Sequence, residues 1–405
     1  MDQAQISRKE FISLLTKCGI FLFGASAGLT TFAEFQNEDS FRKYAPVAKY
    51  WSLIDSKDFK RKCADCHSGK SMNENSSFKH QGRYIKCLLC AQGCVLKEGE
   101  TGRCRARANV DGVLKTLVYG RPISLHVDPI EKKPFYHFLP GSQAYSLATA
   151  GCPLSCKFCQ NWSISQAKPE DFPGHYTHAY DISNNAKAGK VPIIAFTYNE
   201  PTVFIEYLLD IAGEAKRDNI RSVMVSCGFM NPDPLKDLCG ALDAIKIDLK
   251  GFSEDFYRKV CNAELKPVLR TIKQISKTKT HLEIVNLVVP TLNDSDKMLT
   301  NLCEWISGEI GDDVPIHFTR FHPDYKLSNL PPTPVETLER AREIAMSKGI
   351  HYAYVGNVPG HPANSTYCPS CKKAVIKRSN FFVEEMNLIH GRCKYCNHKI
   401  AGVWS

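Results

Sequence analysis

The sequence lacks a long apolar run. The uncharged stretch near its start, residues 18–33, is shorter than the roughly 20 residues that a membrane-spanning helix needs. The preceding SRKEFISLL and the A-x-A match at residues 25–27 fit a twin-arginine export signal, although Lys9 stands where the second arginine is expected. We therefore expect residues 1–33 to be an export signal, a membrane anchor or an amphipathic helix of a cytoplasmic protein.

The sequence also lacks the evenly spread cysteines of a disulfide framework, although it contains 18 cysteines in 405 residues. Most of them form four groups, at positions 63/66, 87/90/94/104, 152/156/159 and 368/371/393/396. Close C-x2-C pairs favour metal binding over disulfides in a chain of this size. The isolated cysteines are interpreted as small buried hydrophobic residues; they are Cys18, Cys227, Cys239, Cys261 and Cys303.

Acidic residues are fewer than basic ones, and the formal net charge is +10. The excess positive charge lies in the two cysteine-rich flanks, where it offsets the charge of metal-bound thiolates. We therefore do not expect a nucleic-acid partner. A chain of 405 residues that is 43% hydrophobic can bury a large core and form more than one domain.

The run GCPLSCKFCQNW at residues 151–162 is the most informative motif. Cys152, Cys156 and Cys159 supply three thiolates, and no fourth cysteine or histidine follows closely, which argues against a closed zinc site. An iron–sulfur cube normally takes four cysteines, so three ligands leave one iron open for a small molecule. This C-x3-C-x2-C spacing is typical of enzymes that bind S-adenosylmethionine (SAM) at a [4Fe–4S] cluster and cleave it to a 5′-deoxyadenosyl radical.

The flanking cysteine groups predict closed metal sites. Cys87, Cys90, Cys94 and Cys104 can close a zinc or iron–sulfur site, although a zinc-ribbon pairing of 63/66 with 87/90 is an alternative. In the tail, two C-x2-C pairs stand 21 residues apart, which predicts a zinc ribbon or a rubredoxin-like iron site; its ligands are Cys368, Cys371, Cys393 and Cys396.

A third cysteine pair has the spacing of a haem-attachment motif. Cys63, Cys66 and His67 form C-x2-C-H, which would bind c-type haem in an exported protein and would be a metal-binding pair or a redox dithiol in a cytosolic one. The haem and export hypotheses therefore depend on each other.

The central sequence alternates apolar strand-like runs with helical stretches. We expect strands at 144–150, 192–199, 222–228, 244–250, 281–290, 315–322 and 352–358. Helices are expected at 201–218 and 334–348, among others. This alternation predicts an α/β fold with a parallel sheet, arranged as a partial (β/α)6-type TIM barrel. The expected divisions are 1–33, a 34–82 linker, an 83–143 cysteine-rich module, a 144–365 core and a 366–405 metal ribbon.

Several stretches resemble the radical SAM enzyme of the AmmeMemoRadiSam system, a family similar to pyruvate formate-lyase and other glycyl-radical enzyme activases. They are GCPLSCKFCQNWSISQ, YGRPISLHVDPIEKKPFYHFLPGS, FTYNEPTVFIEY and the cysteine-bearing tail. The resemblance covers residues 83–405. It implies that Cys152, Cys156 and Cys159 are the catalytic cluster ligands and that Asn199 and Glu200 contact the amino group of SAM.

Asp248 and Lys250 end the fourth expected strand and share one face, so contacts with SAM or a substrate are implied for both. An ordinary helix start at Glu200-Pro201 and a structural ion pair at Asp248 are the alternatives.

The sequence therefore predicts a radical SAM oxidoreductase or activase-like enzyme that abstracts hydrogen from an unknown substrate. A glycyl-radical enzyme activase is one alternative, and an exported haem and iron–sulfur electron-transfer protein is another. The expected partners are a reducing protein of flavodoxin or ferredoxin type and the Memo-like and AMMECR1-like proteins of the system. An oxygen-sensitive cluster favours the cytoplasm over export or membrane anchoring.

Overall fold

The structure is a computed structural model that describes residues 38–54, 84–172 and 175–405. It divides into two units, Met1–Tyr44 and Ala45–Ser405. The described part of the first unit is one helix, α3 (Glu38–Tyr44). Among the described residues, no helix is both long and apolar enough to cross a membrane. The expected leader at 1–33 and the Cys63-Cys66-His67 motif lie outside the described residues.

An eight-stranded sheet forms the centre of the second unit, in the order β13-β12-β11-β10-β9-β8-β7-β6. Its strands are β6 (Ser124–Pro129), β7 (Gln143–Ala148), β8 (Ile193–Phe196), β9 (Arg221–Ser226), β10 (Ala244–Asp248), β11 (His281–Val288), β12 (Ile316–Arg320) and β13 (Ala353–Gly356). The strands from β7 to β13 are parallel, and β6 pairs antiparallel with β7. The predicted α/β class and parallel sheet are therefore confirmed, while β6 extends the sheet into the expected 83–143 module.

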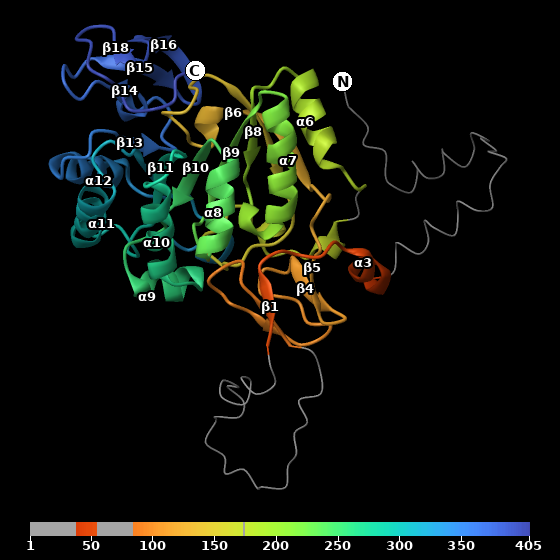
Figure 1. Ribbon diagram of the computed structural model, residues 1–405. Helices are drawn as coiled ribbons and strands as arrows, with labels where there is room; N and C mark the ends of the chain where they lie inside the picture. Colours follow the sequence, from red (N-terminus) through yellow and green to blue (C-terminus); the bar gives the residue numbers. More distant parts are fainter. Residues whose placement is uncertain (1–37, 55–83, 173–174) are drawn as a thin grey trace, which may run out of the picture. The chain divides into compact units, whose positions relative to one another are not determined.

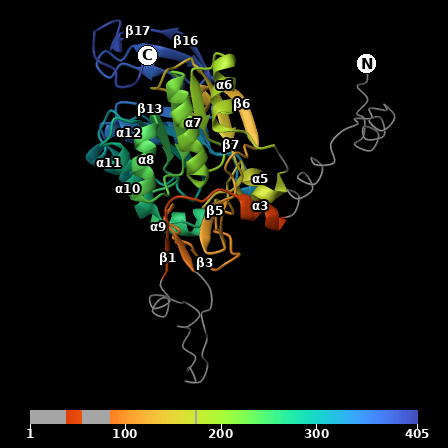
Figure 2. The same ribbon diagram turned by 45° about the vertical axis from the view of Figure 1, so that its right-hand side comes forward.

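Helices connect successive parallel strands and lie along one face of the sheet (Figures 1 and 2). They are α5 (Trp162–Ser165), α6 (Ala179–Ala188), α7 (Ile205–Arg217), α8 (Pro232–Ala241), α9 (Glu254–Phe256), α10 (Leu265–Ile275), α11 (Asp296–Glu309) and α12 (Val335–Ser347). Short 3-10 turns lie at Ile130–Lys132, Pro169–Asp171, Pro201–Phe204, Tyr325–Leu327 and Pro362–Asn364, and a π-helical turn lies at Tyr257–Cys261.

The sequence explains why these elements form. The β8 strand is buried at every position, as expected for a strand covered on both faces. Helix α10 is amphipathic, with buried Leu265, Val268, Ile272 and Ile275 at helical spacing. Helix α11 is capped at its N-terminus by Ser295, whose side chain accepts a hydrogen bond from the backbone N–H of Met298.

Two small sheets precede the central one. Strands β1 (Trp51–Leu53), β2 (Ile85–Cys87) and β3 (Val95–Leu96) form the first, and β4 (Arg107–Val110) and β5 (Val113–Thr116) form the second. Strand β1 pairs with β2 from Trp51 to Leu53, so this part of the expected 34–82 linker belongs to the cysteine-rich module.

The tail forms strands β14 (Thr366–Tyr367), β15 (Ala374–Ser379), β16 (Phe382–Met386), β17 (Leu388–Ile389) and β18 (Arg392–Cys393). It and the cysteine-rich module lie at opposite ends of the central sheet (Figure 1). The tail is tied to the segment before β7, because Leu139 and Val403 share a backbone hydrogen bond of 2.8 Å and Arg378 donates to the backbone oxygen of Tyr136 at 2.7 Å.

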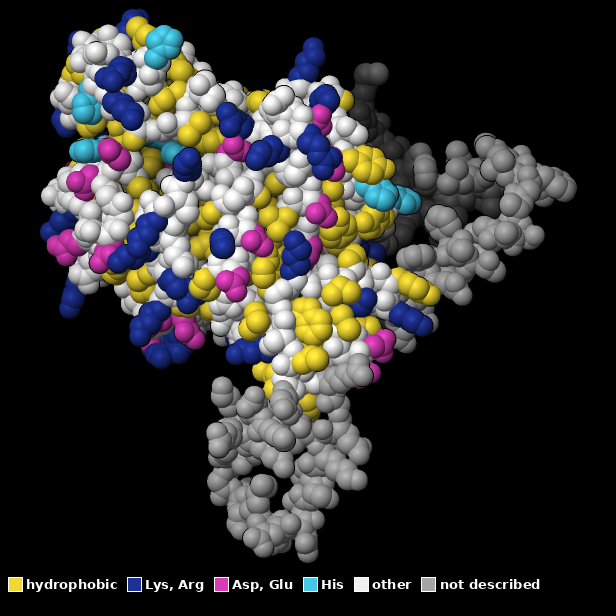
Figure 3. Space-filling model, viewed as in Figure 1, with side chains coloured by type: hydrophobic (Ala, Val, Ile, Leu, Met, Phe, Trp, Pro, Cys, Tyr) yellow, Lys and Arg dark blue, Asp and Glu magenta, His cyan; other side chains and the backbone are white. Residues whose placement is uncertain are grey.

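Basic side chains do not gather into one patch on the face seen in Figure 3. Lysine and arginine are interspersed there with acidic and apolar side chains.

Candidate functional site

The loop that follows β7 contains Cys152, Cys156 and Cys159. It lies against the π-helical turn, because Ser155 donates its backbone N–H to Cys261 O and Lys157 donates to Val260 O, both at 3.0 Å. A second anchor comes from Gly151, whose N–H donates to Ile164 O at 2.9 Å. Cys156 is buried and the other two cysteines are partly buried. The sequence thus places three thiols in one anchored loop at the carboxyl end of a parallel strand.

Two further cysteines lie beside this loop. The thiol of Cys261 hydrogen-bonds with Cys156, and this bond lowers the pKa of Cys156. Cys227 follows β9 and interacts electrostatically with Cys152. Both residues are buried, as the sequence interpretation expected. Their place next to the triplet was not foreseen, because each is isolated in the sequence and only the parallel strand order brings them there.

The segment after β8 carries Asn199 and Glu200. The Asn199 side chain donates to Gly151 O at 2.9 Å, which links this segment to the cysteine loop. Its amide oxygen is buried and has no hydrogen-bond partner. This orphan acceptor lies beside the triplet, where the ammonium group of a ligand could donate to it.

The carboxylate of Glu200 accepts hydrogen bonds from other residues of the protein. It accepts hydrogen bonds from the backbone N–H of Thr202 at 3.1 Å and of Cys227 at 2.7 Å, and from the hydroxyl of Ser226 at 2.8 Å. Pro201 occupies the first position of the following turn. Glu200 therefore fixes the end of β8 against the end of β9, and the helix-start alternative is present in the structure.

Asp248 lies between two lysines at the end of β10. Lys246 Nζ contacts one carboxylate oxygen at 2.7 Å, and Lys250 Nζ contacts the other at 3.3 Å. Burial alone would raise the pKa of Asp248, but the two ammonium groups outweigh it and lower the pKa to about 2. Burial would likewise lower the pKa of Lys250, yet Asp248 and Cys156 hold it well above its usual value. The Asp248 carboxylate and the Lys250 ammonium are therefore charged at neutral pH.

A second polar cluster, missed by the sequence analysis, lies next to this one. Asp128 on β6 accepts from Lys133 Nζ at 2.5 Å, and the Tyr198 hydroxyl also donates to it. Burial lowers the pKa of Lys133 to about 8 although Asp128 opposes the shift. The charge of Lys246 also lowers the pKa of Lys133, so the cluster adjoins the end of β10. An Asp and a Lys five residues apart gave no signal because their contact depends on how the chain turns after β6.

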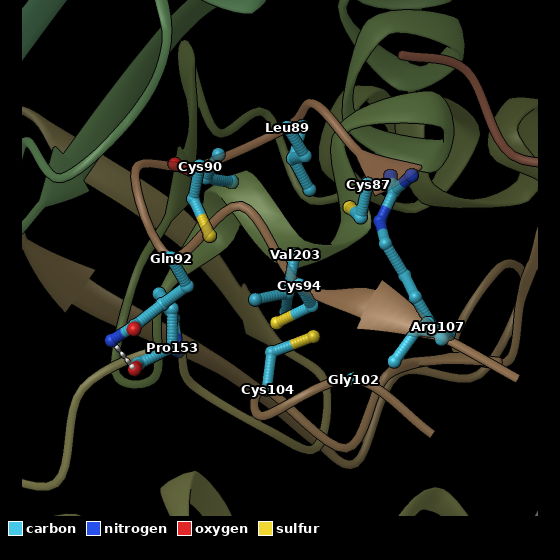
Figure 4. A pocket seen from close by; sticks show the side chains of 12 residues that line it. Cys87, Leu89, Cys90, Gln92, Cys94, Gly102, Cys104, Arg107, Pro153 and Val203 are labelled. Atoms are coloured by element: carbon cyan, nitrogen blue, oxygen red, sulfur yellow. Dashed lines mark hydrogen bonds between the residues drawn. The ribbon is translucent and has the colours of Figure 1, made fainter. Parts of the chain in front are cut away.

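The cysteine-rich module is attached at the same end of the sheet. Gln92 Nε2 donates to Pro153 O at 2.9 Å, and Asn231 Nδ2 donates to Leu88 O at 2.8 Å. Cys87, Cys90, Cys94 and Cys104 line one pocket of this module (Figure 4). The structure thus brings the first predicted quartet beside the triplet.

The tail quartet is compact. The Sγ atoms of Cys368 and Cys396 are 3.6 Å apart, and those of Cys371 and Cys393 are 3.7 Å apart. All four sulfurs lie within 4.8 Å of one another, so they could hold a metal ion. Four sulfurs at about 2.3 Å from one zinc ion are separated by about 3.8 Å in a tetrahedron, which these distances match.

The sequence pattern of the Radical SAM superfamily matches residues 146–303. An uncharacterized protein of Methanocaldococcus jannaschii is 44% identical over 318 residues, which cover 78% of this chain and 95% of that protein. The pyruvate formate-lyase-activating enzyme of Staphylococcus epidermidis is 25% identical over 219 residues, covering 49% of this chain and 86% of that enzyme.

Among solved structures, Streptococcus suis SuiB bound to S-adenosylmethionine is similar with a TM-score of 0.44 and 11% identity, over 56% of this chain and 53% of that one.

Proposed function

Because the chain belongs to the radical SAM superfamily, we propose that it is an enzyme that cleaves SAM reductively and abstracts a hydrogen atom from a substrate. Superfamily membership implies a [4Fe–4S] cluster and SAM, which together supply a 5′-deoxyadenosyl radical when bound. The observation that carries the proposal is the anchored loop with three thiols at the carboxyl ends of the parallel strands, within the matched segment 146–303.

The residues at this end of the sheet fit the two cofactors. Cys152, Cys156 and Cys159 provide three thiolates for a cluster and leave one iron for SAM. The unpartnered amide oxygen of Asn199 suits the SAM ammonium group. Glu200 positions this segment by joining the ends of β8 and β9.

We propose that Asp248 and Lys250 contact the ribose and the carboxylate of SAM. Because two lysines keep Asp248 ionised, its carboxylate can accept hydrogen bonds from ribose hydroxyls. The charged ammonium of Lys250 can balance the SAM carboxylate and the thiolate charge of the triplet, with which it already interacts through Cys156. The protein's part in the chemistry is to orient SAM and to exclude water.

The finer assignment rests on the resemblance. We propose that the chain is the radical SAM enzyme of the AmmeMemoRadiSam system and that Memo-like and AMMECR1-like proteins are its partners. A reducing protein of flavodoxin or ferredoxin type would deliver the electron. Glycyl-radical activation is the second candidate function, and the 25% identity to a pyruvate formate-lyase-activating enzyme favours it.

Anaerobic reconstitution with iron and sulfide, followed by dithionite and SAM, tests the main proposal. We expect 5′-deoxyadenosine from the wild type and its loss in Cys156→Ala. Cys239→Ala is the matched control, because Cys239 lies on α8 and its carbonyl accepts a bond from Thr280 rather than meeting the triplet. If a protein with a full cluster yields no 5′-deoxyadenosine, the proposal is wrong.

A further inference from the structure

The four cysteines of the N-terminal module face one space. Their sulfur atoms point into a pocket that is also lined by Leu89, Leu96 and Val203 (Figure 4). Two turns bring them together, because Cys87 N–H donates to Cys94 O at 2.9 Å and Gly102 N–H donates to Arg107 O at 2.7 Å. A Cβ atom on Gly102 would lie 3.8 Å from Cys104 Sγ and 3.9 Å from Cys94 Sγ. The glycine therefore keeps the space beside two sulfurs free of a side chain.

We define the quartet as Cys87, Cys90, Cys94 and Cys104. Its sulfur atoms are spaced more widely than those of the tail quartet. Among the described residues, only the tail quartet has three or more candidate ligand atoms within 4.8 Å of one another. One zinc ion holds four thiolates about 3.8 Å apart. A [4Fe–4S] cube holds them farther apart, because each thiolate binds a different iron. The wider spacing of converging sulfurs favours the cube over a single ion.

The surroundings of the quartet also suit a cluster. Cys87, Cys90 and Cys104 are buried, and buried thiolates need a cationic partner to offset their desolvation. The neighbouring cation, Arg107, already pairs with the Glu206 carboxylate at 2.6 Å, and one guanidinium cannot balance four thiolates, so a metal group would supply the remaining positive charge. The apolar lining keeps water away from such a group.

The quartet lies directly beside the triplet loop. A Cβ atom on Gly151 would lie only 2.3 Å from the backbone oxygen of Cys104, so the two segments are in van der Waals contact. Gln92, which lies between Cys90 and Cys94, donates to the residue after Cys152 at 2.9 Å. A cluster in the quartet would therefore be the immediate neighbour of a cluster in the triplet.

We propose that Cys87, Cys90, Cys94 and Cys104 bind a second [4Fe–4S] cluster that relays electrons to the triplet. All four of its irons have a cysteine, so it binds no SAM. A flavodoxin- or ferredoxin-type donor gives up one electron, the second cluster is reduced from the 2+ to the 1+ state, and it returns to 2+ when the electron passes to the triplet's cluster. The relay rests on the proposed function, whereas the identity of the metal group does not.

Metal analysis of the full chain tests the cluster itself. Cys63→Ser and Cys66→Ser are included throughout, so that this pair contributes no iron. We expect about eight irons and about eight sulfides per chain, together with about one zinc from the tail. Cys90→Ser/Cys104→Ser should retain about four irons and the same zinc. Cys239→Ser/Cys303→Ser, which replaces two cysteines outside the quartet and triplet, should retain all the iron.

The triplet variant makes the test independent of SAM cleavage and of how well the quartet variant folds. With Cys152, Cys156 and Cys159 all changed to Ala, we expect about four irons and, after reduction by dithionite, the electron paramagnetic resonance signal of a [4Fe–4S]1+ cluster. A second zinc in place of this iron would overturn the proposal. In the protein with both sites, the two reduced clusters should broaden each other's signals, and an unbroadened sum of the two signals would place them apart and overturn the relay.

The relay has a kinetic readout as well. With reduced flavodoxin as the donor, Cys90→Ser/Cys104→Ser should form 5′-deoxyadenosine at least tenfold more slowly than the parent protein that carries only Cys63→Ser and Cys66→Ser. With dithionite, a small molecule that can reach the triplet directly, the rates should agree within about twofold. Equal rates with flavodoxin would contradict the relay and leave the proposed radical chemistry untouched.

Discussion

Arg107 and Glu206 form a buried ion pair that joins the cysteine-rich module to the central sheet. Arg107 Nη2 lies 2.6 Å from both carboxylate oxygens of Glu206, and the side chains are only 1% and 8% exposed. The same carboxylate accepts the backbone N–H of Lys49 at 2.7 Å. Strand β4 supplies the arginine and helix α7 supplies the glutamate, so the pair fixes the module next to the helix that follows β8.

Arg107→Met should destabilise the protein by about 3–5 kcal/mol, because it leaves the Glu206 carboxylate buried without its cation. The free energy of unfolding in urea, measured anaerobically, checks this. Lys348→Met is the matched control, since Lys348 pairs with Glu304 at 2.8 Å on the surface and should cost less than about 1 kcal/mol. The double variant Arg107→Met/Glu206→Leu should recover most of the loss, and a double variant as unstable as Arg107→Met would contradict the argument.

Gly151→Ala should disrupt the contact between the module and the triplet loop. Gly151 has φ +95°, and its added Cβ would meet Cys104 O at 2.3 Å. Backbone strain and overpacking together should cost about 2–5 kcal/mol, and the iron content after reconstitution should fall. Gly213→Ala, on an exposed part of α7 with no atom within 4 Å of the new Cβ, should leave both quantities unchanged or raise stability slightly. Unaltered thermal unfolding of Gly151→Ala would show that the contact is dispensable.

The parallel strands were predictable because each is a short buried apolar run. The run at 192–199, for example, contains the entirely buried β8. Strand β6 was missed because SLHVDP contains three charged or polar positions and a proline, and it is a strand only because β7 offers it an edge. Propensity cannot reveal a pairing that tertiary contact decides.

The candidate site, like the sheet, was only partly predictable from the sequence. The triplet is local in sequence, so its spacing alone predicts a cluster loop. The contacts of Cys227 and Cys261 with that loop, and of Lys133 with Tyr198, join residues on different strands and turns. Only the order of the strands makes them neighbours, and no single stretch of sequence contains that information.

Removal of metal from the tail should destabilise the tail and spare SAM cleavage. The tail sulfurs are spaced for one zinc ion, and small metal modules depend on their ion to fold. Cys371→Ser/Cys396→Ser should therefore lose about one zinc per chain and become open to proteolysis within residues 366–405. Ser370→Ala, within the same turn, is the control. Because the tail and the triplet lie at opposite ends of the sheet, 5′-deoxyadenosine formation should change by less than about twofold; loss of activity with intact iron would argue against this separation.

His137 should make the protein less stable as the pH falls. Its ring nitrogens contact Ala401 O and the Tyr354 hydroxyl, both at 2.5 Å, and burial lowers its pKa to about 3. Below about pH 6.5 the unfolded chain takes up a proton that the folded protein does not bind, so this contribution to stability is present above that pH and is lost progressively down to about pH 3.

Between pH 7.5 and 5.0 the free energy of unfolding of the wild type should fall by about 2 kcal/mol more than that of His137→Gln. Urea unfolding at the two pH values measures the difference, and His351→Gln, at an exposed histidine, controls for the loss of one imidazole. Equal pH dependence in wild type and His137→Gln would mean that His137 is not held neutral by its burial.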